Sequence, residues 1–440
     1  MKKKKKHICL STLKDRGWTQ SLIDQLLPPP KLVRNPHYSC APEMKTWPLS
    51  IVEEAETNPV FVEAFKKKQE RKQKKQEKHD AMIATIADVL QTQNPADDYP
   101  QARAIKRHFI LEVGETNTGK TYEALEAMKR AERGVYLAPL RLLAMEVQDS
   151  LLSAGVPCSM LTGEESSIIP DAQHMSSTVE MLNLNTEYDV GIIDECQLLA
   201  DPERGGAWTR AILGLCAPVI YLCLPPHALK VCTKLIDLCK DTYEVRKKER
   251  KVPLEFSGEV DFSDLQRGDA VIVFSRKGVL EMANEISLKT GLTTGTIYGA
   301  LPYRNRKEQV DRFRNGEIDV IVSTDAIGMG MNLPIRRVVF AQTKKFNGYC
   351  VSPLSGESVK QIAGRAGRYG MYDTGYVAIL KNTGSTRVIK DGLQNSISAY
   401  SQAYVPFPEK MLSMKKWPSV ENCIKTWLDV PYPACFTLFR

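Results

Sequence analysis

The chain has 440 residues, which is enough for two or three domains that each bury a core. Hydrophobic residues make up 43% and charged residues 25%, an ordinary globular composition, and no run of roughly eighteen apolar residues occurs, so we expect no membrane span. Because Met1–Lys6 lacks both the apolar core of a secretory signal and the pattern of a transit peptide, we expect a cytoplasmic location.

The net charge of +8 is concentrated near the N-terminus. Lys2–Lys6 contribute +5, and residues 66–78, with eight basic and two acidic side chains, contribute +6, which leaves −3 for the rest of the chain. This basic excess would attract a polyanion such as nucleic acid. The alternative is a set of solvated lysines that only aid solubility.

The eleven cysteines include no Cys-x-x-Cys pair. Cys196, Cys216, Cys223 and Cys232 lie in apolar surroundings. We therefore interpret the cysteines as reduced core thiols and expect no structural zinc.

Residues 1–80 are predicted to form a small, mostly helical, basic unit that resembles a nucleic-acid-binding module. Ser11–Leu27 predicts a short helix, a break at Gly17 and a second helix capped at Thr19. A strand at Met44–Leu49 and an acidic helix follow, and the lysine-rich segment Phe65–His79 has a helical composition. Residues 81–102 are predicted to be a helix and a linker.

This N-terminal unit resembles the DNA-binding domain of the xeroderma pigmentosum group A repair scaffold. The resemblance rests on Asn35-Pro-His, on a Met44-Lys-x-aromatic strand and on the long basic helix, and Ser39–Pro42 lacks the aromatic residue that such proteins place after Asn-Pro-His. Trp18, Tyr38 and Trp47 would then stack on bases while the lysines contact phosphates. In the alternative interpretation these aromatic residues form the core of a small domain.

A phosphate-binding loop is predicted between an apolar strand and a helix. The strand is His108–Val113, the loop is Gly114-Glu-Thr-Asn-Thr-Gly-Lys-Thr121, and the helix is Tyr122–Lys129. Backbone N–H groups and the positive end of the helix dipole then converge on one point, where a polyphosphate binds. We expect ATP to contact Gly114, Thr116, Asn117, Thr118, Gly119, Lys120 and Thr121, with Lys120 reaching the β- and γ-phosphates and Thr121 holding Mg²⁺.

Strands and helices alternate from His108 to Val245, with continuous apolar strands at Gly134–Ala138, Tyr188–Ile193 and Pro218–Leu224. This pattern is typical of a parallel sheet covered on both faces, as in a RecA-like domain. The second of these strands leads into Asp194-Glu-Cys-Gln197 at the carboxyl edge of the sheet, where ligands of such sheets bind. We expect Asp194 to hold Mg²⁺ and Glu195 to orient and deprotonate the attacking water. Without a phosphate loop upstream, an Asp-Glu pair would more often begin a solvated helix.

A second α/β unit is predicted from Val252 to Leu380. Its strands are Asp269–Phe274, Asp319–Ser323, Arg336–Ala341 and Gly375–Leu380. It has no phosphate loop, but Gln361-Ile-Ala-Gly-Arg-Ala-Gly-Arg368 places two arginines three residues apart on a Gly-rich helix. We interpret Arg365 and Arg368 as arginine fingers that stabilise the charge on the γ-phosphate of ATP. Two surface arginines on a helix are the alternative.

Residues 103–385 resemble the superfamily 2 helicases and are most similar to the mitochondrial degradosome RNA helicase and its bacterial relatives. The resemblance rests on motifs in the expected order: Gly114–Thr121, Ala138–Ala144, Leu161–Glu165, Ser177–Met181, Asp194–Gln197, Ser323–Asn332 and Gln361–Arg368. It implies two tandem RecA-like domains. It also implies that Arg141, Thr162, Gly163, Thr178, Glu180, Ser275, Arg276 and Thr324 contact the nucleic acid, and that Gln197, Asp325, Gly328 and Gln361 couple the ATP cleft to that contact surface.

Two features depart from the family pattern. Leu222-Cys-Leu-Pro-Pro226 stands where family members have Leu-Cys-Gly-acidic-Pro, which affects the link between hydrolysis and strand movement. The chain ends 72 residues after Arg368, so we expect 391–440 to be a short appendix rather than a full C-terminal helical region.

We therefore expect an α/β protein with domains at 103–248, which binds ATP, and 249–390, which carries the arginine fingers. The predicted function is an ATP- and Mg²⁺-dependent helicase or translocase, acting on RNA rather than DNA, with the 3′ to 5′ direction implied by the family. The alternative is an ATP-switched DNA-binding or remodelling protein of the repair or recombination type. We expect a monomer with no membrane partner, and a protein partner is possible through the N-terminal unit.

Overall fold

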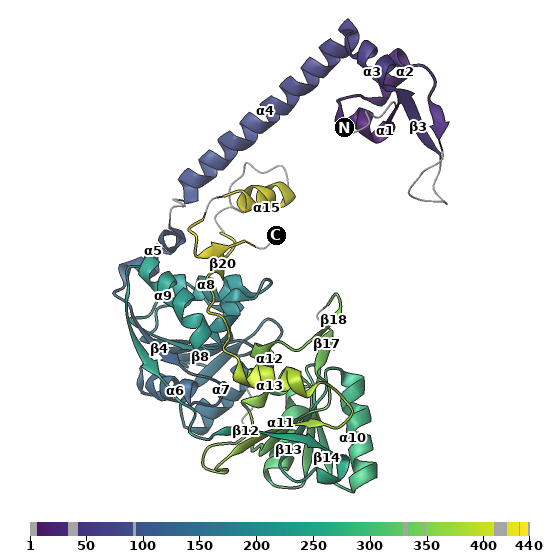
Figure 1. Ribbon diagram of the computed structural model, residues 1–440. Coiled ribbons are helices and arrows are strands. Elements are labelled where there is room, and N and C mark those ends of the chain that lie inside the picture. Colours follow the sequence, from purple (N-terminus) through teal and green to yellow (C-terminus); the bar gives the residue numbers. More distant parts are fainter. Residues whose placement is uncertain are drawn as a thin grey trace. The chain divides into compact units, whose positions relative to one another are not determined.

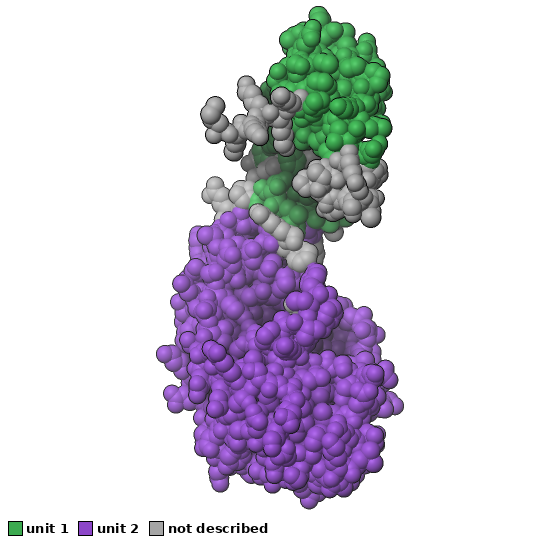
Figure 2. Space-filling view, turned by 45° about the vertical axis from the view of Figure 1, so that its right-hand side comes forward, with its two compact units in different colours: residues 1–89, 418–430 green, residues 90–417, 431–440 purple. Residues whose placement is uncertain are grey.

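The computed structural model describes residues 7–33, 43–90, 94–328, 333–346, 348–408, 420–430 and 432–438. The chain divides into two compact units, shown in green and purple in Figure 2. Unit 1 comprises residues 1–89 and 418–430, and unit 2 comprises residues 90–417 and 431–440.

Unit 1 contains an antiparallel sheet with the strand order β1-β3-β2 (Figure 1). Its strands are β1 His7–Cys9, β2 Lys31–Val33 and β3 Met44–Pro48, and its helices are α1 Leu10–Asp15, α2 Gln20–Leu26, α3 Leu49–Glu56, α4 Pro59–Leu90 and α15 Val420–Leu428. The predicted break and cap are confirmed, because Gly17 has a φ of 102° and the Thr19 hydroxyl accepts a hydrogen bond from the amide of Leu22. Asn35–Pro42, on which the repair-scaffold resemblance depends, lies outside the described residues.

The two tryptophans of unit 1 belong to its core. Trp18 and Trp47 are 1% and 2% exposed, and their ring nitrogens donate to the Glu56 carboxylate at 3.0 Å and the Pro28 carbonyl at 2.8 Å. The suggestion that these rings stack on bases is therefore wrong, because a small domain needs its large aromatic side chains to fill its core. Helix α4 extends from Pro59 through the lysine-rich segment to Leu90, beyond the predicted end of the unit.

The first sheet of unit 2 has the order β11-β4-β10-β9-β5-β8-β6-β7. Neighbours from β11 to β6 are parallel, and β7 pairs with β6 in the antiparallel sense. The strands are β4 His108–Val113, β5 Gly134–Ala138, β6 Cys158–Leu161, β7 Ser166–Ser167, β8 His174–Thr178, β9 Val190–Ile193, β10 Val219–Leu224 and β11 Thr242–Lys247. The accompanying helices are α5 Pro100–Ala104, α6 Lys120–Arg130, α7 Arg141–Ser153, α8 Gly205–Gly214 and α9 Leu229–Leu238.

The core of this first domain forms because alternate residues of continuous apolar strands point to opposite faces. Helices α6 and α7 bury Ala124, Met128, Val147 and Leu151 against one face. Helix α8 contacts β9 and helix α9 contacts β11. Cys196, Cys216, Cys223 and Cys232 are free and buried, as predicted.

The second sheet is parallel and has the order β12-β19-β16-β13-β15-β14. The strands are β12 Leu254–Val260, β13 Asp269–Ile272, β14 Thr294–Ile297, β15 Val320–Ser323, β16 Arg337–Phe340 and β19 Gly375–Leu380. Helix α10 (Arg276–Thr290) packs on one face, and α11 (Tyr303–Arg314), α12 (Gly356–Ala363) and α13 (Thr386–Gln394) pack on the other. Two tandem RecA-like domains are thus confirmed. Short pairs are formed by β17 Lys344–Phe346 with β18 Val351–Pro353 and by β20 Ala403–Tyr404 with β21 Phe436–Thr437.

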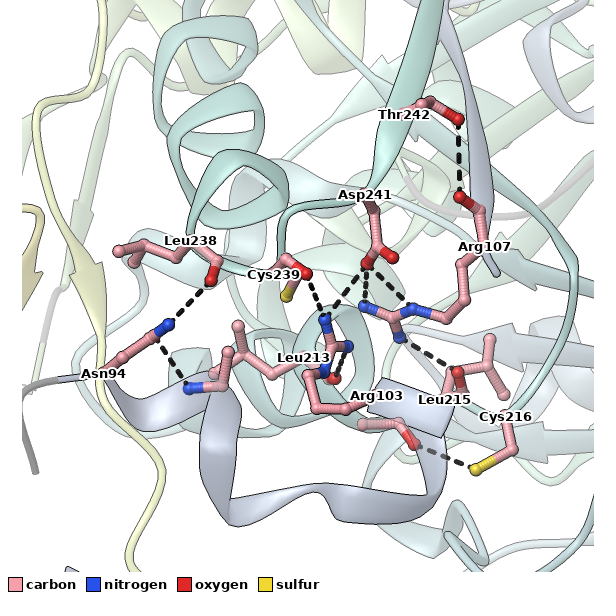
Figure 3. Close-up of polar contacts among 12 residues, drawn as sticks. Asn94, Arg103, Arg107, Leu213, Leu215, Cys216, Leu238, Cys239, Asp241 and Thr242 are labelled. Carbon is pink, nitrogen blue, oxygen red and sulfur yellow. Dashed lines mark hydrogen bonds and ion pairs between the residues drawn. The ribbon is translucent and has the colours of Figure 1, made fainter. Parts of the chain in front are cut away.

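Residues 94–104, which we predicted to be part of a linker, pack on the first domain (Figure 3). The Asn94 side chain donates to the Leu238 carbonyl at 2.7 Å, and Arg103 donates to the carbonyls of Cys239 and Leu213 at 2.7 and 2.8 Å. Arg107 is fully buried and donates twice to one Asp241 oxygen, at 2.6 and 2.9 Å. Hydrogen bonds and the Arg103–Asp241 ion pair hold this segment, and local composition does not reveal these contacts because the partners are far apart in sequence.

No helix in the described part of the chain is long and apolar enough to cross a membrane.

Candidate ATP-binding site

The phosphate loop lies between β4 and α6. An added Cβ at Gly114 would lie 2.6 Å from the Lys248 carbonyl, so only glycine fits there. Asn117 and Gly119 have left-handed φ values of 65° and 80°. These conformations turn the chain sharply before helix α6 begins at Lys120, whose Nζ donates to the Gly114 carbonyl at 2.6 Å and the Glu115 carbonyl at 3.3 Å.

Asp194 faces Thr121 at the carboxyl edge of the sheet. The Thr121 hydroxyl lies 3.3 and 3.4 Å from the two Asp194 oxygens, and the Tyr136 hydroxyl donates to Asp194 at 2.7 Å. Burial, reinforced by the charge of Glu195, raises the pKa of Asp194 to about 6. One buried carboxylate beside one hydroxyl suits Mg²⁺, which takes few protein ligands and fills its shell with phosphate oxygens and water.

Glu195 and Gln197 follow Asp194 in a turn that departs from the strand. Glu195 has a left-handed φ of 50°, and the Gln197 amide donates to its carboxylate. The Trp208 ring nitrogen donates to the Asp194 carbonyl at 2.9 Å, which fixes the start of this turn. The strained backbone thus directs the Glu195 carboxylate into the cleft, and such strain is common at functional sites.

A cavity of about 680 Å³ lies between the two domains and contains both predicted partners, Lys120 and Arg365. Its wall includes residues 116–122 of the phosphate loop and α6, together with Asp194 and Glu195. The inner faces of α7 and α11 complete it. Within the described residues, no group of three or more His, Cys, Asp or Glu side chains forms an additional metal site.

The two arginines do not lie on a helix, contrary to our prediction. Helix α12 ends at Ala363, and Arg365 and Arg368 lie in the turn that follows. Glycine is required at position 364, because an added Cβ there would lie 2.6 Å from Thr116 Cβ, and Gly367 turns the chain with a left-handed φ of 70°. Arg365 lines the cavity and donates to the Gly328 carbonyl at 2.6 Å. Arg368 is not among the residues that line it, and its role stays a prediction.

Two of the four predicted coupling residues meet in a second, smaller cavity of about 20 Å³. Gln197 and Gln361 line it, together with Lys120 and Glu195. Gly328 contributes the carbonyl that holds Arg365, whereas Asp325 forms an ion pair with Lys345. The structure therefore brings Gln197, Gln361 and Gly328 to the cleft from different elements.

The predicted nucleic-acid contacts of the first domain lie at strand ends and helix starts. Arg141 is the first residue of α7 and forms an ion pair with Glu164. Glu180 is exposed and pairs with Arg204 at 2.7 Å, and an added Cβ at Gly163 would meet no atom within 4 Å. Thr162 and Thr178 are 4% and 9% exposed, so only a small part of each residue is accessible.

The corresponding residues of the second domain are mostly exposed. The Ser275 hydroxyl accepts from the Gly278 amide at 3.0 Å and caps α10, and the Arg276 guanidinium lies 5.4 Å from the centre of the Tyr298 ring. Thr324 is 8% exposed. The nucleic-acid role of both sets stays a prediction.

Sequence reasoning missed a group of residues that line the large cavity. They are Glu146 of α7 and Tyr303, Arg306, Lys307, Val310 and Arg314 of α11. Burial raises the pKa of Glu146 to about 7, against the opposing effect of Arg365, Arg306 and Arg314. The spacing of Tyr303, Val310 and Arg314 indicates one face of a helix, but nothing local shows that this face meets α7.

Comparison with known proteins identifies relatives of both domains. Residues 95–248 match the DEXQ-box helicase domain of Suv3, and residues 255–370 match the helicase conserved C-terminal domain. The mitochondrial ATP-dependent RNA helicase SUV3 of Candida albicans is 41% identical over 324 residues, which cover 71% of this chain and 44% of the relative. The mitochondrial SUV3 of Saccharomyces cerevisiae is 37% identical (77% and 46% covered), and the mitochondrial SUPV3L1 of Mus musculus is 35% identical (76% and 45% covered).

The chain spans less than half the length of these three relatives. Their names place them in mitochondria, so our prediction of a cytoplasmic location is wrong. That prediction rested on Met1–Lys6 alone, and the chemistry of the cleft does not depend on the compartment.

Proposed function

Because the chain belongs to the superfamily 2 helicases of the Suv3 type, we propose that it is an ATP-dependent RNA helicase. ATP is hydrolysed between the two RecA-like domains. The observation that carries this proposal is the shared cavity, which contains Lys120 of the first domain and Arg365 of the second. ATP that contacts both domains draws the domains together, and loss of its γ-phosphate lets the domains separate.

ATP is held mainly by the first domain. The loop 114–119 offers backbone N–H groups to the phosphates, and Lys120 exchanges its carbonyl partners for the β- and γ-phosphates. Thr121 and Asp194 hold Mg²⁺, which neutralises charge on the phosphates when it is bound. Gly114, Thr116, Asn117, Thr118, Gly119, Asp325, Gly328 and Gln361 complete the nucleotide contacts.

Hydrolysis depends on groups from both domains. Glu195 orients the attacking water and accepts its proton, and Gln197 holds the Glu195 carboxylate in place. Arg365, with Arg368 as its predicted partner, stabilises the charge that develops on the γ-phosphoryl group. Arg365 must exchange the Gly328 carbonyl for phosphate oxygens when ATP binds.

The RNA contacts proposed for the chain are Arg141, Thr162, Gly163, Thr178, Glu180, Ser275, Arg276 and Thr324. Contacts of this kind hold the sugar–phosphate backbone rather than read bases. Helix α4, whose lysines are exposed, adds an electrostatic contact in unit 1. We further propose that the protein acts as a monomer in mitochondria, where its relatives are named to reside, with 103–248 and 249–390 as the helicase domains.

Strand displacement tests this proposal. ATP hydrolysis and unwinding are compared on matched RNA, DNA and hybrid duplexes with 3′ or 5′ overhangs, and RNA with a 3′ overhang is expected to give the fastest unwinding. Lys120→Ala should abolish both activities, whereas Lys129→Ala, on the same helix, should retain them. RNA-stimulated hydrolysis without any strand displacement would instead favour an ATP-switched binding protein, and full activity of Lys120→Ala would reject the assigned site.

A further inference from the structure

Arg250 lies in the segment of residues 248–253, which joins the first domain to the second between β11 and β12. Its Nε donates to the Val252 carbonyl at 2.7 Å, within the same segment. Its Nη1 donates to the Gly364 carbonyl at 2.6 Å and to the Thr116 carbonyl at 3.2 Å, and its Nη2 donates to the Ala366 carbonyl. One side chain therefore contacts the phosphate loop, the arginine loop (residues 364–368) and the connection between the domains.

The two carbonyls that Arg250 holds in the arginine loop belong to the residues on either side of Arg365. Fixing the carbonyls of Gly364 and Ala366 fixes the backbone from which the Arg365 side chain starts. The Thr116 carbonyl is held by the same guanidinium, so one planar group bridges the arginine loop and the phosphate loop. Thr116 and Gly364 are also in direct contact, since an added Cβ on Gly364 would lie 2.6 Å from Thr116 Cβ.

The partners of Arg250 are carbonyl oxygens, and within the described residues no carboxylate pairs with it. Burial lowers the pKa of Arg250, although an arginine stays charged at neutral pH. A half-buried guanidinium with four of its five N–H donors directed to carbonyls is suited to hold loop geometry. An arginine that contacts an RNA phosphate would instead direct its N–H donors to solvent and the phosphate.

We propose that Arg250 is a positioning residue that sets Arg365 against the phosphate loop and transmits the closure of the domains to that arrangement. This inference rests on the proposed ATP hydrolysis at the same site. Arg250 acts through Arg365 and does not itself touch the reacting atoms. ATP binding depends mainly on the first domain, so loss of Arg250 affects turnover more than nucleotide affinity.

A double-mutant cycle tests the proposal. Arg250→Ala should lower kcat for RNA-stimulated ATP hydrolysis about 10²-fold, the effect of a misplacement near 1 Å, and change the KM for ATP less than about 3-fold. When Arg365→Ala is already present, adding Arg250→Ala should lower kcat less than about 3-fold further. If the fold-losses in kcat of the two single variants multiplied in the double variant, Arg250 would act independently of Arg365 and the inference would be overturned.

A conservative variant separates geometry from charge. Arg250→Lys keeps the charge and the alkyl stem, but its single nitrogen cannot span the carbonyls of Thr116, Gly364 and Ala366, so kcat should stay at least 10-fold below wild type. Full rescue by lysine would overturn the positioning role. Lys247→Ala, an exposed residue just before this segment, is the matched control and should leave kcat unchanged.

Hydrogen exchange in the nucleotide-free protein tests the same idea without turnover. The amides of Gly364, Arg365, Ala366 and Gly367 donate to carbonyls of their own domain and should be protected in the wild-type protein. Arg250→Lys should reduce their protection about 10-fold, because the loop loses its external support. Unchanged protection would overturn the inference whether or not the protein hydrolyses ATP, whereas an inactive wild-type protein with the expected exchange would contradict only the proposed function.

Discussion

The Asn117 side chain donates to the Gly367 carbonyl at 3.2 Å, so the phosphate loop of the first domain touches the arginine loop of the second. Asn117 has a left-handed φ of 65°, which asparagine and glycine tolerate better than other residues. Asn117→Gly keeps this backbone and removes the contact. We expect kcat for ATP hydrolysis to fall about 5-fold, which corresponds to a hydrogen bond worth about 1 kcal/mol. A kcat unchanged by this substitution would show that the contact has no part in the reaction.

The pKa of Asp194, raised to about 6, makes Mg²⁺ binding dependent on pH. The carboxyl group must lose its proton to bind the cation, and about three quarters of it is protonated at pH 5.5. The Mg²⁺ concentration that gives half-maximal hydrolysis should therefore rise about fourfold between pH 7.5 and pH 5.5. Saturating Mg²⁺ should remove much of this difference, because metal and proton compete. A midpoint that does not vary with pH would contradict the assignment.

Glu146 is expected to lower stability at high pH. Its pKa is raised from 4.5 to about 7, so the folded state binds the proton more tightly than the unfolded state. The stabilisation by this proton is fully present below about pH 4.5 and is lost as the pH rises to about 7. Glu146→Gln should therefore stabilise the nucleotide-free protein at pH 8, by up to about 3 kcal/mol, and much less at pH 5.

The control for Glu146 is Glu126→Gln, a partly exposed position beside Lys129 on α6. The free energies of unfolding of both variants are measured with denaturant at pH 5 and pH 8. An equal effect of Glu146→Gln at pH 5 and pH 8 would contradict the burial argument.

The buried pair of Arg107 and Asp241 should matter for stability rather than for catalysis. Arg107→Ala leaves Asp241, 8% exposed, with Arg103 at 3.3 Å as its remaining cation. We expect the free energy of unfolding of the first domain to fall by about 3 kcal/mol, near the lower end for a broken buried pair. Thermal unfolding would show the loss, and the KM for ATP of the folded protein should not change. A variant as stable as wild type would contradict the stabilising role of the buried Arg107–Asp241 pair (Figure 3).

The sequence predicted best those elements whose signal is local. Buried parallel strands are continuous apolar runs, so β4, β5 and β19 were predicted with the bounds that the structure shows. The same holds for the cap at Thr19, because a side-chain hydroxyl beside an apolar helix face is a local pattern. The phosphate loop and Asp194 were placed together because parallel strands share one carboxyl edge.

The features that the sequence did not predict depend on contacts between distant segments. Gly364, just after α12 ends at Ala363, approaches Thr116 so closely that a Cβ would not fit, although the two residues are nearly 250 positions apart. Arg250 resembles its basic neighbours in the sequence and differs only in the carbonyls that surround it. The residues of α11 that line the cavity have the ordinary spacing of one helix face. The sequence does not show that this face lies opposite α7.

Single-turnover hydrolysis by Arg365→Ala tests most directly whether one ATP is held by both domains. With RNA present, the rate should fall at least about 10³-fold, the usual contribution of an arginine finger, while the affinity for a non-hydrolysable ATP analogue changes less than about 3-fold. A rate within twofold of the wild-type value would show that the second domain does not contribute to the reaction, and the proposed cleft mechanism would be wrong.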